Sequence, residues 1–379
     1  MGILFYIGWT LRFIIRKQLS RLYIQMPDVD INDIRLPGQF KGETFSGFKK
    51  TEVRNQLVEN LKKGKVEPAC YWCAELVCAG QYIDVWEIIL YFLGKHIHLG
   101  NPKMAIYIQM RYQIFRNIIE QGFYTNDLQL RNNPNIRKLF AEIICIIAMS
   151  NRKPSFETIK INRSEEFDIT HIHERLKASS IEFIQPIFKP KDPQELLIAL
   201  NEFAYNVSSE VKNMNNACYW IEWLIEFDHV CKGNREPTRC QARNYPVENK
   251  FRRDIIWLVW DVIFHESGQR NNDFLAKVHS ALLELFCIKY TTAASKKRRY
   301  LMYFAVEILT EPIMSAGDIV ADKAVLETVI THIDQVYKQI KQNEHSPNTE
   351  YLFSNIEKER TFEQTIRKME MMNSMDMFA

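Results

Sequence analysis

The sequence predicts an all-α fold made of two related helical bundles in tandem, joined by a short connector that is irregular or a β-hairpin. Three observations predict it. Gly and Pro number only 13 each in 379 residues, against a combined share of about 12% in average proteins. Apolar residues recur at helical spacing, as at Trp86, Leu90, Leu93 and Ile97, where strands would alternate. Three short blocks of sequence occur twice in the same order, which is typical of an internal repeat.

Composition and charge are those of a globular protein. Charged residues make up 25% and hydrophobic residues 46%, which excludes disorder throughout the chain. The 49 basic and 46 acidic residues give a net charge of +3, too small by itself to indicate nucleic-acid binding. Eight cysteines without regular spacing indicate free thiols in a reducing, intracellular compartment.

An apolar leader, residues 1–25, opens the chain. Residues 3–15 are apolar except for Thr10 and Arg12, and this run is shorter than the roughly 20 apolar residues that span a bilayer. Its positive charges follow the apolar run, whereas a secretory signal has them before it. The alternatives are a helix docked on the protein, a true start at Met26, and an interfacial helix in peripheral contact with a membrane.

We expect the first bundle over residues 26–152 and the second over residues 192–342. The tetrapeptide 69–72, Ala-Cys-Tyr-Trp, recurs at 217–220, and four identical letters that include Trp rarely coincide by chance. Val85-Trp86 is echoed by Val259-Trp260, and the block 139–143 by 303–307. The positions expected to define the repeated fold are Tyr71, Trp72, Trp86, Gly100, Pro102, Tyr219, Trp220 and Trp260.

Three helix starts are marked by Asn or Asp followed by Pro. Asn101-Pro102, Asn133-Pro134 and Asp192-Pro193 each put a capping side chain before a proline at the first helical position. Glu195 is spaced to complete a capping box after Asp192. These signals predict that the cap side chains bind the first free backbone N–H groups of their helices.

Residues 153–191 connect the two bundles. The segment 155–188 is rich in Thr, Ile and Phe, which favour strands, so a short hairpin is one of its two expected forms. The second bundle carries an insertion at 228–250, rich in Arg, Asn and Pro, which we expect to form a loop. A polar, flexible tail, 343–379, ends the chain and is Met-rich from residue 369 onward.

A set of residues in the first bundle carries a family resemblance. They are Ala69, Tyr71, Trp72, Ala79, Gly80, Asp84 and the stretch 97–102. In this pattern the chain resembles the C-terminal helical domain of clamp-loader-like AAA+ ATPases, in particular the replication-associated recombination proteins and the Werner-helicase-interacting group. Helix 136–150 and the turn 152–155 are similar to a later helix and turn of those proteins. The resemblance implies a helical collar that holds subunits together on DNA.

The chain departs from that family in two ways. Trp86-Glu87 and the stretch 94–96 stand where the family has paired arginines and a Ser-Glu-Asp triplet. Gly42 and Gly47 have the glycine spacing of a phosphate-binding loop, but the lysine and hydroxyl that should follow are out of register. The ATPase module is absent from this sequence. More loosely, the whole chain resembles uncharacterised proteins of large eukaryotic DNA viruses.

Cysteines and histidines in the first bundle match the ligand types of a zinc site. Cys70 and Cys73, with Cys78, His96 and His98 further along the chain, could supply the two thiolates and two imidazoles of a tetrahedral site. The two cysteines, however, lie within an apolar helix, and the second copy retains only the first of them, as Cys218. We therefore expect buried, free thiols there.

The other candidate chemistry also has a simpler explanation. His171 and His173 lack a third ligand. Glu75 and Glu222 both follow a Tyr-Trp pair, and a carboxylate duplicated with its helix is best explained by helix packing or an ion pair. We expect no catalytic residues, no cofactor and no metal, and hence no enzyme.

Basic runs are the remaining sign of a binding surface. Exposed positive side chains contact phosphates whatever the base sequence. The residues predicted to bind nucleic acid are Lys62, Lys63, Lys65, Lys296, Lys297, Arg298, Arg299, Arg252 and Arg253. Tyr245 and Tyr300 lie close to two of these runs and are candidates for stacking on bases. The alternative is that the runs are solvated loops or meet an acidic protein partner.

These features predict a non-catalytic binding and oligomerisation protein associated with DNA replication or repair, similar to a clamp-loader collar without its motor. The expected partners are replication factors, DNA and further copies of the chain. The alternative function is a structural protein, a minor capsid or scaffold component, of a large DNA-virus particle. In that case the partners would be shell proteins, and the location would be the host cell or the virion.

Overall fold

The computed structural model describes residues 29–122, 126–163, 167, 173–312 and 317–344. Over these residues the chain is mostly helical and contains no strand, so the predicted all-α class is confirmed. The leader 1–25 and all but two residues of the tail 343–379 lie outside the described residues, and the interfacial-helix hypothesis therefore stays a prediction. None of the helices in the described part of the chain has the length and apolarity needed to cross a membrane.

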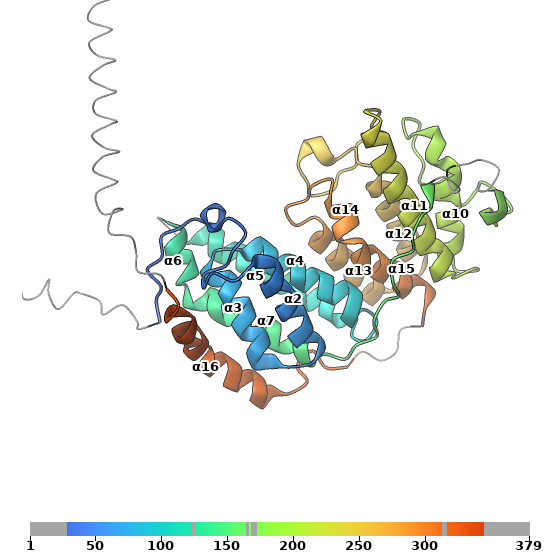
Figure 1. Cartoon of the computed structure of the whole chain (residues 1–379). Helices are drawn as coiled ribbons and strands as arrows, with labels where there is room; N and C mark the ends of the chain where they lie inside the picture. Colours follow the sequence, from blue (N-terminus) through green and yellow to red (C-terminus); the bar gives the residue numbers. More distant parts are fainter. Residues whose placement is uncertain (1–28, 123–125, 164–166, 168–172, 313–316, 345–379) are drawn as a thin grey trace, which may run out of the picture.

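The first group of helices occupies one end of the molecule (Figure 1). Its segments are a short 3-10 turn η1 (Pro37–Phe40), α2 (Lys50–Lys62), α3 (Val66–Cys78), α4 (Tyr82–Phe92), the π-helical turn η2 (Leu93–Ile97), α5 (Lys103–Gln121), α6 (Asp127–Arg131) and α7 (Pro134–Met149). Almost every residue of α7 from Leu139 to Ala148 is buried. This helix is therefore the centre of the first bundle.

The second group forms the other end of the molecule (Figure 1). Its segments are η3 (His173–Arg175) and η4 (Gln194–Leu196), α10 (Leu197–Val207), α11 (Met214–Gly233), η5 (Asn249–Phe251), α12 (Ile256–Gln269), α13 (Asp273–Phe286), α14 (Ala294–Lys297) and α15 (Arg299–Thr310). α15 is buried along its length from Tyr300 to Thr310. It takes the central place in this bundle that α7 takes in the first.

Equivalent helices make equivalent contacts in the two bundles. In the first bundle α2 packs on α3, and both α3 and α5 pack on α7. In the second α10 packs on α11, and both α11 and α13 pack on α15. The repeated sequence blocks lie on the corresponding pairs α3 and α11, α4 and α12, and α7 and α15. The repeat in the sequence is thus also a repeat of helix packing.

Gly100 lies where the backbone of another segment leaves no room for a side chain. A Cβ atom at Gly100 would lie 2.6 Å from the backbone Cα and C atoms of Arg152, a distance that real side chains do not reach. Backbone hydrogen bonds from the N–H of Lys153 to the carbonyl of Ile97 (3.1 Å) and from Ser155 to Lys95 (2.8 Å) hold the two segments together. The stretches 97–102 and 152–155, both singled out in the sequence, are therefore in direct contact.

Buried polar contacts join the two bundles. The guanidinium of Arg298 donates to Glu87 Oε1 (2.6 Å) and to the carbonyl of Phe286 (2.6 Å). His98 Nδ1 lies 2.7 Å from Glu307 Oε2, and its ring stacks on Phe304 at 4.9 Å. These contacts connect α4 and η2 of the first bundle to α13 and α15 of the second.

The last described helix, α16 (Lys323–Lys341), returns to the first bundle although it follows the second in sequence (Figure 1). It packs on α3 and α7. Its buried residues are Ile333, Tyr337 and Ile340, and the guanidinium of Arg137 stacks 4.6 Å from the Tyr337 ring. At its end Glu344 accepts a hydrogen bond from the backbone N–H of Asn32, which brings both ends of the described chain together.

Of the three predicted helix caps, that of Asn133 is confirmed. Its side chain accepts hydrogen bonds from the N–H groups of Asn135 (2.8 Å) and Ile136 (3.3 Å) at the start of α7. The cap predicted at Asn101 is wrong. Its amide instead donates to the carbonyl of Asp318 (3.2 Å), because the segment before α16 crosses over this turn.

The capping box predicted at Asp192 and Glu195 is also wrong. The Asp192 carboxylate is buried and bound by Arg243, with Nη2 to Oδ2 at 2.6 Å. It also accepts from the backbone N–H groups of Lys189 and Gln241, both at 2.8 Å. A buried arginine competes better for a carboxylate than the free N–H groups of a helix start. Asp192 therefore ties the insertion loop to the connector.

The connector and the insertion differ in part from expectation. Over its described residues the connector 153–191 is irregular, so the β-hairpin alternative is wrong there. Contacts with the second bundle shape it: Phe156 stacks on Tyr303 at 5.1 Å, and Glu202 accepts from the N–H groups of Lys177 and Ala178, each at 2.9 Å. Within the insertion 228–250, residues 228–233 continue α11, and the loop begins only after Gly233.

Candidate nucleic-acid interface

Positive side chains from three separate segments meet at one corner of the first bundle. We call this group the basic corner. It consists of Lys62, Lys63, Lys65, Lys95, His96 and Arg152. The turn between α2 and α3 supplies the three lysines at 62, 63 and 65, all exposed. Gly64 makes this sharp turn possible, because its φ of +67° lies in the left-handed region that glycine adopts without strain.

Arg152 is held at the corner by the ends of two helices. Its guanidinium donates to the carbonyls of Leu61 (2.8 Å) and Lys62 (2.5 Å) at the end of α2, and to that of Ala148 (2.5 Å) near the end of α7. The last carbonyls of a helix have no partner within it and carry partial negative charge. Arg152 satisfies both ends at once, and it also lies 5.5 Å over the ring of Phe92.

The π-helical turn η2 contributes Lys95 and His96. Single π-helical turns are rare and are frequent at functional sites. Burial, and then the positive charges of Lys62, Lys95 and Arg152, lower the pKa of His96 from its ordinary 6.5 to about 4. Cations from three segments thus lower the pKa of a single side chain, His96. His96 is neutral at pH 7.

A groove of about 330 Å³ runs from the basic corner between α2 and α4. Its lining residues are Arg54, Asn55, Val58, Glu59, Lys62, Glu87, Ile88 and Tyr91. Arg54 and Lys62 lie on one face of α2, eight residues apart, and Tyr91 is half-buried on α4. The groove therefore combines cations with an aromatic ring, the two groups that bind single-stranded nucleic acids. Both cations also have carboxylate partners: Arg54 pairs with Asp84 at 3.0 Å and Lys62 with Glu59 at 2.9 Å.

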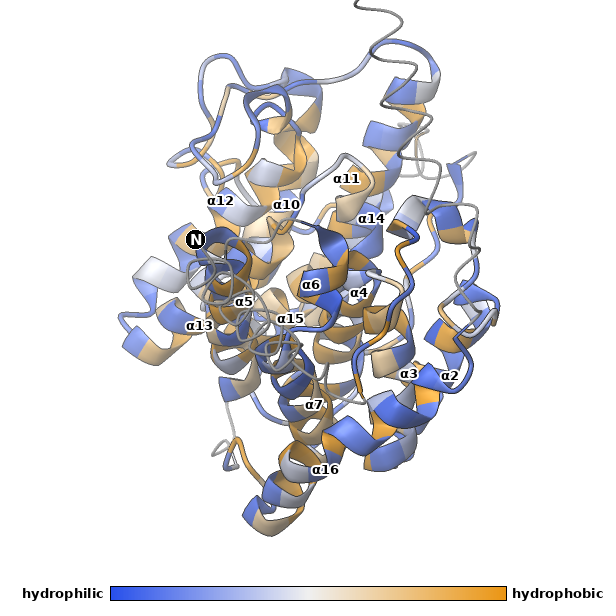
Figure 2. Ribbon diagram, turned by 90° about the vertical axis from the view of Figure 1, so that its left-hand side faces the viewer, coloured by the Kyte–Doolittle hydropathy of each residue, from blue (hydrophilic) through white to orange (hydrophobic). Residues whose placement is uncertain are grey.

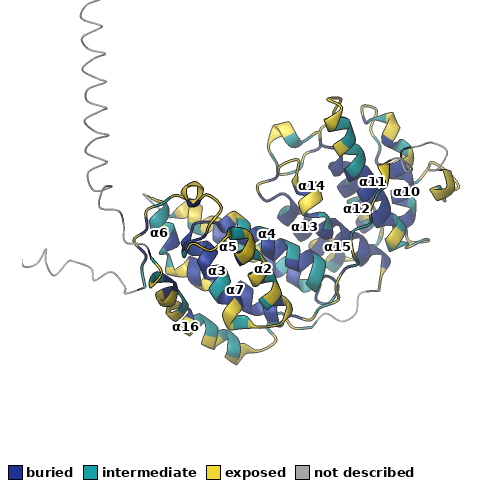
Figure 3. Cartoon of the chain, in the orientation of Figure 1, coloured by how far each residue is buried: buried dark blue, intermediate teal, exposed yellow. Residues whose placement is uncertain are grey.

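The structure divides the predicted run 296–299. Lys296 and Lys297 are exposed on α14, which lies at the surface (Figure 3). Arg298 is buried in its pair with Glu87, and Arg299 Nη1 binds Glu222 Oε2 at 2.6 Å. Both arginines are engaged in ion pairs within the fold, so the structure does not offer them as free contacts for nucleic acid.

The run at Arg252 and Arg253 is divided in a similar way. Arg252 is half-buried and donates to the carbonyl of Val247 (3.4 Å), whereas Arg253 is exposed. These residues lie by the insertion loop, in the second bundle, and are not brought to the basic corner.

The two tyrosines proposed for base stacking are used inside the protein. The hydroxyl of Tyr245 donates to Asp261 (2.7 Å), and its ring lies 4.9 Å from that of Trp257. Tyr300 is buried, with its ring 5.9 Å from that of Tyr91. Both rings are therefore packed within the fold and are not placed on the basic corner as stacking platforms. Tyr91, which the sequence analysis did not select, is more exposed than Tyr300.

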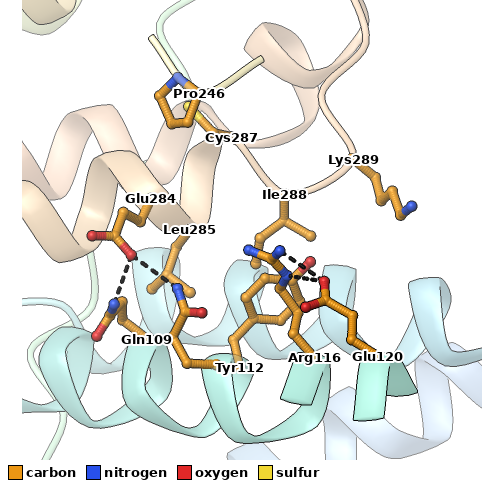
Figure 4. Close-up of a pocket in the computed structure, with 11 residues that line it drawn as sticks. Gln109, Tyr112, Arg116, Glu120, Pro246, Glu284, Leu285, Cys287, Ile288 and Lys289 are labelled. Carbon is orange, nitrogen blue, oxygen red and sulfur yellow. Dashed lines mark hydrogen bonds and ion pairs between the residues drawn. The ribbon is translucent and has the colours of Figure 1, made fainter. Parts of the chain in front are cut away.

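A second groove, of about 470 Å³, lies between the two bundles (Figure 4). Its walls are α5 and α13. Glu284 accepts hydrogen bonds from Gln109 (2.6 Å) and Gln113 (3.2 Å), and Arg116 pairs with Glu120 at 2.8 Å. The polar groups of this groove thus bind one another, and Glu284 joins the bundles.

The duplicated carboxylates have structural partners. Glu75 accepts from the hydroxyl of Thr44 (2.8 Å) and from the N–H of Ser46 (2.6 Å), so it holds the loop that contains Gly42 and Gly47. Glu222 accepts from the hydroxyl of Tyr303 (2.8 Å) in addition to its pair with Arg299. Both carboxylates act as the packing and ion-pair elements that the sequence predicts.

The candidate zinc ligands are not brought together among the described residues. Among the described residues no group of three or more His, Cys, Asp or Glu is placed to hold a metal. Cys70 and Cys73 are buried in α3, and burial raises the pKa of the Cys70 thiol to about 12. His98 is engaged with Glu307, and of the pair at 171 and 173 only His173 lies within the described residues.

Sequence reasoning missed Arg54, Tyr91, Lys95 and Arg152. A signal existed for the first, because Lys50 and Arg54 are four residues apart and therefore lie on one helical face. Tyr91 and Lys95 are likewise four residues apart. No feature of the sequence indicated the role of Arg152. The position of its guanidinium depends on the ends of α2 and α7 being close together in the folded chain.

Comparison of the chain with family models, with curated proteins and with solved structures gave no match. The resemblance to clamp-loader collars therefore stays a prediction from the residues.

Proposed function

We propose that this chain is a non-catalytic binding and oligomerisation protein of DNA replication or repair, and that its basic corner contacts the phosphate backbone of DNA. The observation that carries the proposal is the convergence of the α2–α3 turn, η2 and Arg152 on one corner. Lys63 and Lys65 make no ion pair with any described residue. Unpaired cations can neutralise phosphates and release counterions, which is the main source of affinity for nucleic acids.

The groove between α2 and α4 supports binding of a single strand in preference to a duplex. It shares Lys62 with the corner and has Tyr91 on its wall. An aromatic ring binds an unstacked base, whereas the bases of a duplex are already stacked. The oligomerisation part of the proposal rests on the family resemblance. The duplicated carboxylates Glu75 and Glu222 bind a loop and an arginine within the fold, which is consistent with a structural role for them.

The test uses the full-length chain and fluorescence anisotropy with a labelled single strand and the matching duplex, over a series of salt concentrations. We expect salt-dependent binding that is tighter for the single strand. The double change Lys63→Glu with Lys65→Glu should weaken binding about tenfold or more and reduce the slope of log K against log salt by about 2, since each lost phosphate contact removes about one unit.

Two control variants make the test specific. Lys277→Glu with Lys323→Glu alters net charge equally at exposed positions outside the corner and should leave the slope unchanged. Lys296→Glu with Lys297→Glu tests the α14 run on its own. Equal weakening by all three double variants would mean that only net charge matters and would contradict the assignment of the corner. No binding by the unmodified chain would remove the DNA proposal.

The process is tested separately. A cross-linked pull-down of the tagged full-length chain from cells that express it, with and without nuclease, should recover clamp, polymerase or helicase subunits. Recovery of shell proteins would favour the structural role in a virus particle. Light scattering of the purified chain checks self-association.

A further inference from the structure

A third groove is apolar and lies between α3 and α16. It has a volume of about 590 Å³. Its apolar walls are Val66 and Cys70 on α3 and Val325, Val329, Ile333 and Val336 on α16. Aliphatic side chains that line a surface groove expose apolar area to water. A segment that covers the groove removes this area from water, which is favourable.

α16 carries more apolar surface than the first bundle covers. Ile333, Tyr337 and Ile340 are buried against α3 and α7, whereas Val325, Val329 and Val336 are only half-buried. Hydrophobic and hydrophilic residues are interleaved along this helix in Figure 2. The half-buried valines form a second apolar stripe, with spacings of four and seven residues, that faces the groove.

The chain continues from the end of this same helix. α16 ends at Lys341, and the residues 345–379, 35 in all, follow it. They begin with a turn-forming stretch that contains Pro347 and Asn348. Even at the helical rise of 1.5 Å per residue this length reaches about 50 Å, whereas the part of α16 that lines the groove, 324–339, is about 24 Å long. The tail can therefore turn and run back along the whole groove.

The sequence of the tail matches an apolar groove. After the turn-forming stretch, apolar residues recur at helical intervals at Phe362, Ile366, Met369 and Met372. Methionine side chains are unbranched and flexible, so they fill irregular apolar surfaces well. The charges between them alternate in sign, as in Glu-Lys-Glu-Arg at 357–360, and do not oppose a largely uncharged groove.

We propose that residues 351–372 of the tail fold back and bind in the groove between α3 and α16 of the same chain. The leader 3–15 is also apolar, but 13 residues separate it from the first described residue, and Arg12 interrupts it. The tail is continuous with one wall of the groove. Covalent continuity gives it a high effective concentration there, which neither a second copy nor a separate partner has.

The test is site-specific photocrosslinking in the full-length chain. The photoreactive residue p-benzoylphenylalanine replaces Gln335, which lines the groove and is exposed. In the control it replaces Asp334, which is also exposed but does not line the groove. We expect a crosslink from position 335, mapped by mass spectrometry to residues 351–372 of the same chain, at least several times stronger than any from position 334.

Tail variants complete the test. Phe362→Ser with Ile366→Ser should abolish the crosslink, whereas Glu363→Ser with Arg367→Ser, which alters neighbouring polar positions, should retain it. A crosslink from position 335 to residues 3–15, a crosslinked dimer on a denaturing gel, or a yield no greater than from position 334 would each overturn the proposal.

Discussion

Gly100 and Gly268 show how differently the surroundings of a glycine restrict a side chain. A Cβ at Gly100 would collide with the backbone of Arg152 at 2.6 Å, whereas a Cβ at Gly268 in α12 meets nothing within 4 Å. The turn 97–102 is therefore restricted by close approach. Gly268 lies within a helix and has room for a side chain. Its main effect is to raise the conformational entropy of the unfolded chain, which lowers stability.

We expect Gly100→Ala to destabilise the protein by about 1–3 kcal/mol, because backbone cannot move aside as a flexible side chain can. Gly268→Ala should stabilise it by roughly 0.5–1 kcal/mol. Urea unfolding of the two variants measures both effects. If the two changes had the same sign, the close approach of 97–102 to 152–155 would be contradicted.

His279 gives the protein a stability that depends on pH. Its side chain is fully buried, with Nε2 2.9 Å from the carbonyl of Ala305 and Nδ1 2.8 Å from Ser267 Oγ. A carbonyl only accepts hydrogen bonds, so the proton is on Nε2 and Nδ1 accepts from the serine. Burial lowers the pKa of His279 from 6.5 to about 4.

Between pH 6.5 and 4 the unfolded chain binds a proton at this histidine that the folded chain does not. Stability is therefore full above pH 6.5 and falls as the pH is lowered toward 4, by about 3 kcal/mol for this residue. We expect His279→Gln to lose less stability than the natural chain over that range. The comparison is made by urea unfolding at several pH values, and a difference that stays constant with pH would contradict this account.

At the scale of one helix, the start of α7 depends on a single side chain. Asn133 caps two free N–H groups, whereas Asn135, two residues later, is exposed. We expect Asn133→Ala to cost about 1 kcal/mol. Asn135→Ala should be neutral or slightly stabilising, since alanine has the higher helix propensity. Thermal unfolding of the matched pair tests this, and equal losses would mean that the cap contributes nothing.

The helical geometry of α14 and α15 also explains why the run 296–299 could not bind as a unit. Lys296 and Lys297 end the short helix α14, Arg298 lies between the two helices, and Arg299 begins α15, so the four side chains do not share one face. Where one face is packed, part of the run must be buried and paired. Lys62, Lys63 and Lys65 remain exposed together because they lie in a turn.

For the whole molecule, the join between the bundles depends on Arg298. It is buried and supplies donors to both Glu87 and Phe286. Arg298→Ala leaves both acceptors without their partner, and we expect a loss of about 3 kcal/mol. Arg253→Ala, at an exposed position, should stay within about 0.5 kcal/mol.

Urea unfolding followed by tryptophan fluorescence measures the effect, and the double variant Arg298→Met with Glu87→Met provides a further check. Replacing both partners removes the unpaired charge, so part of the lost stability should return. A single variant as stable as the natural chain would show that the two bundles hold together without this pair.

Much of the architecture could be predicted from the residues alone. Helical periodicity at Trp86–Ile97 and the repeated Tyr-Trp pairs reflect local rules of spacing, and the structure confirms the class and the recurrence of helix packing. The caps at Asn101 and Asp192 failed because distant groups, the Asp318 carbonyl and Arg243, compete for the same side chains. Such competition has no trace in the neighbouring sequence.

The sequence by itself determined the helical class, the two copies, and the exposed lysines of the α2–α3 turn, since all three follow from spacing and from the conformational freedom of Gly64. Only the tertiary structure decided which cations are free. It buried Arg298, engaged Arg299, paired Lys95 with Glu157 and Lys62 with Glu59, and left Lys63 and Lys65 without an ion pair among the described residues. The physical reason is that burial in low dielectric forces a charge to find a partner, and which charges are buried depends on contacts between residues far apart in the chain.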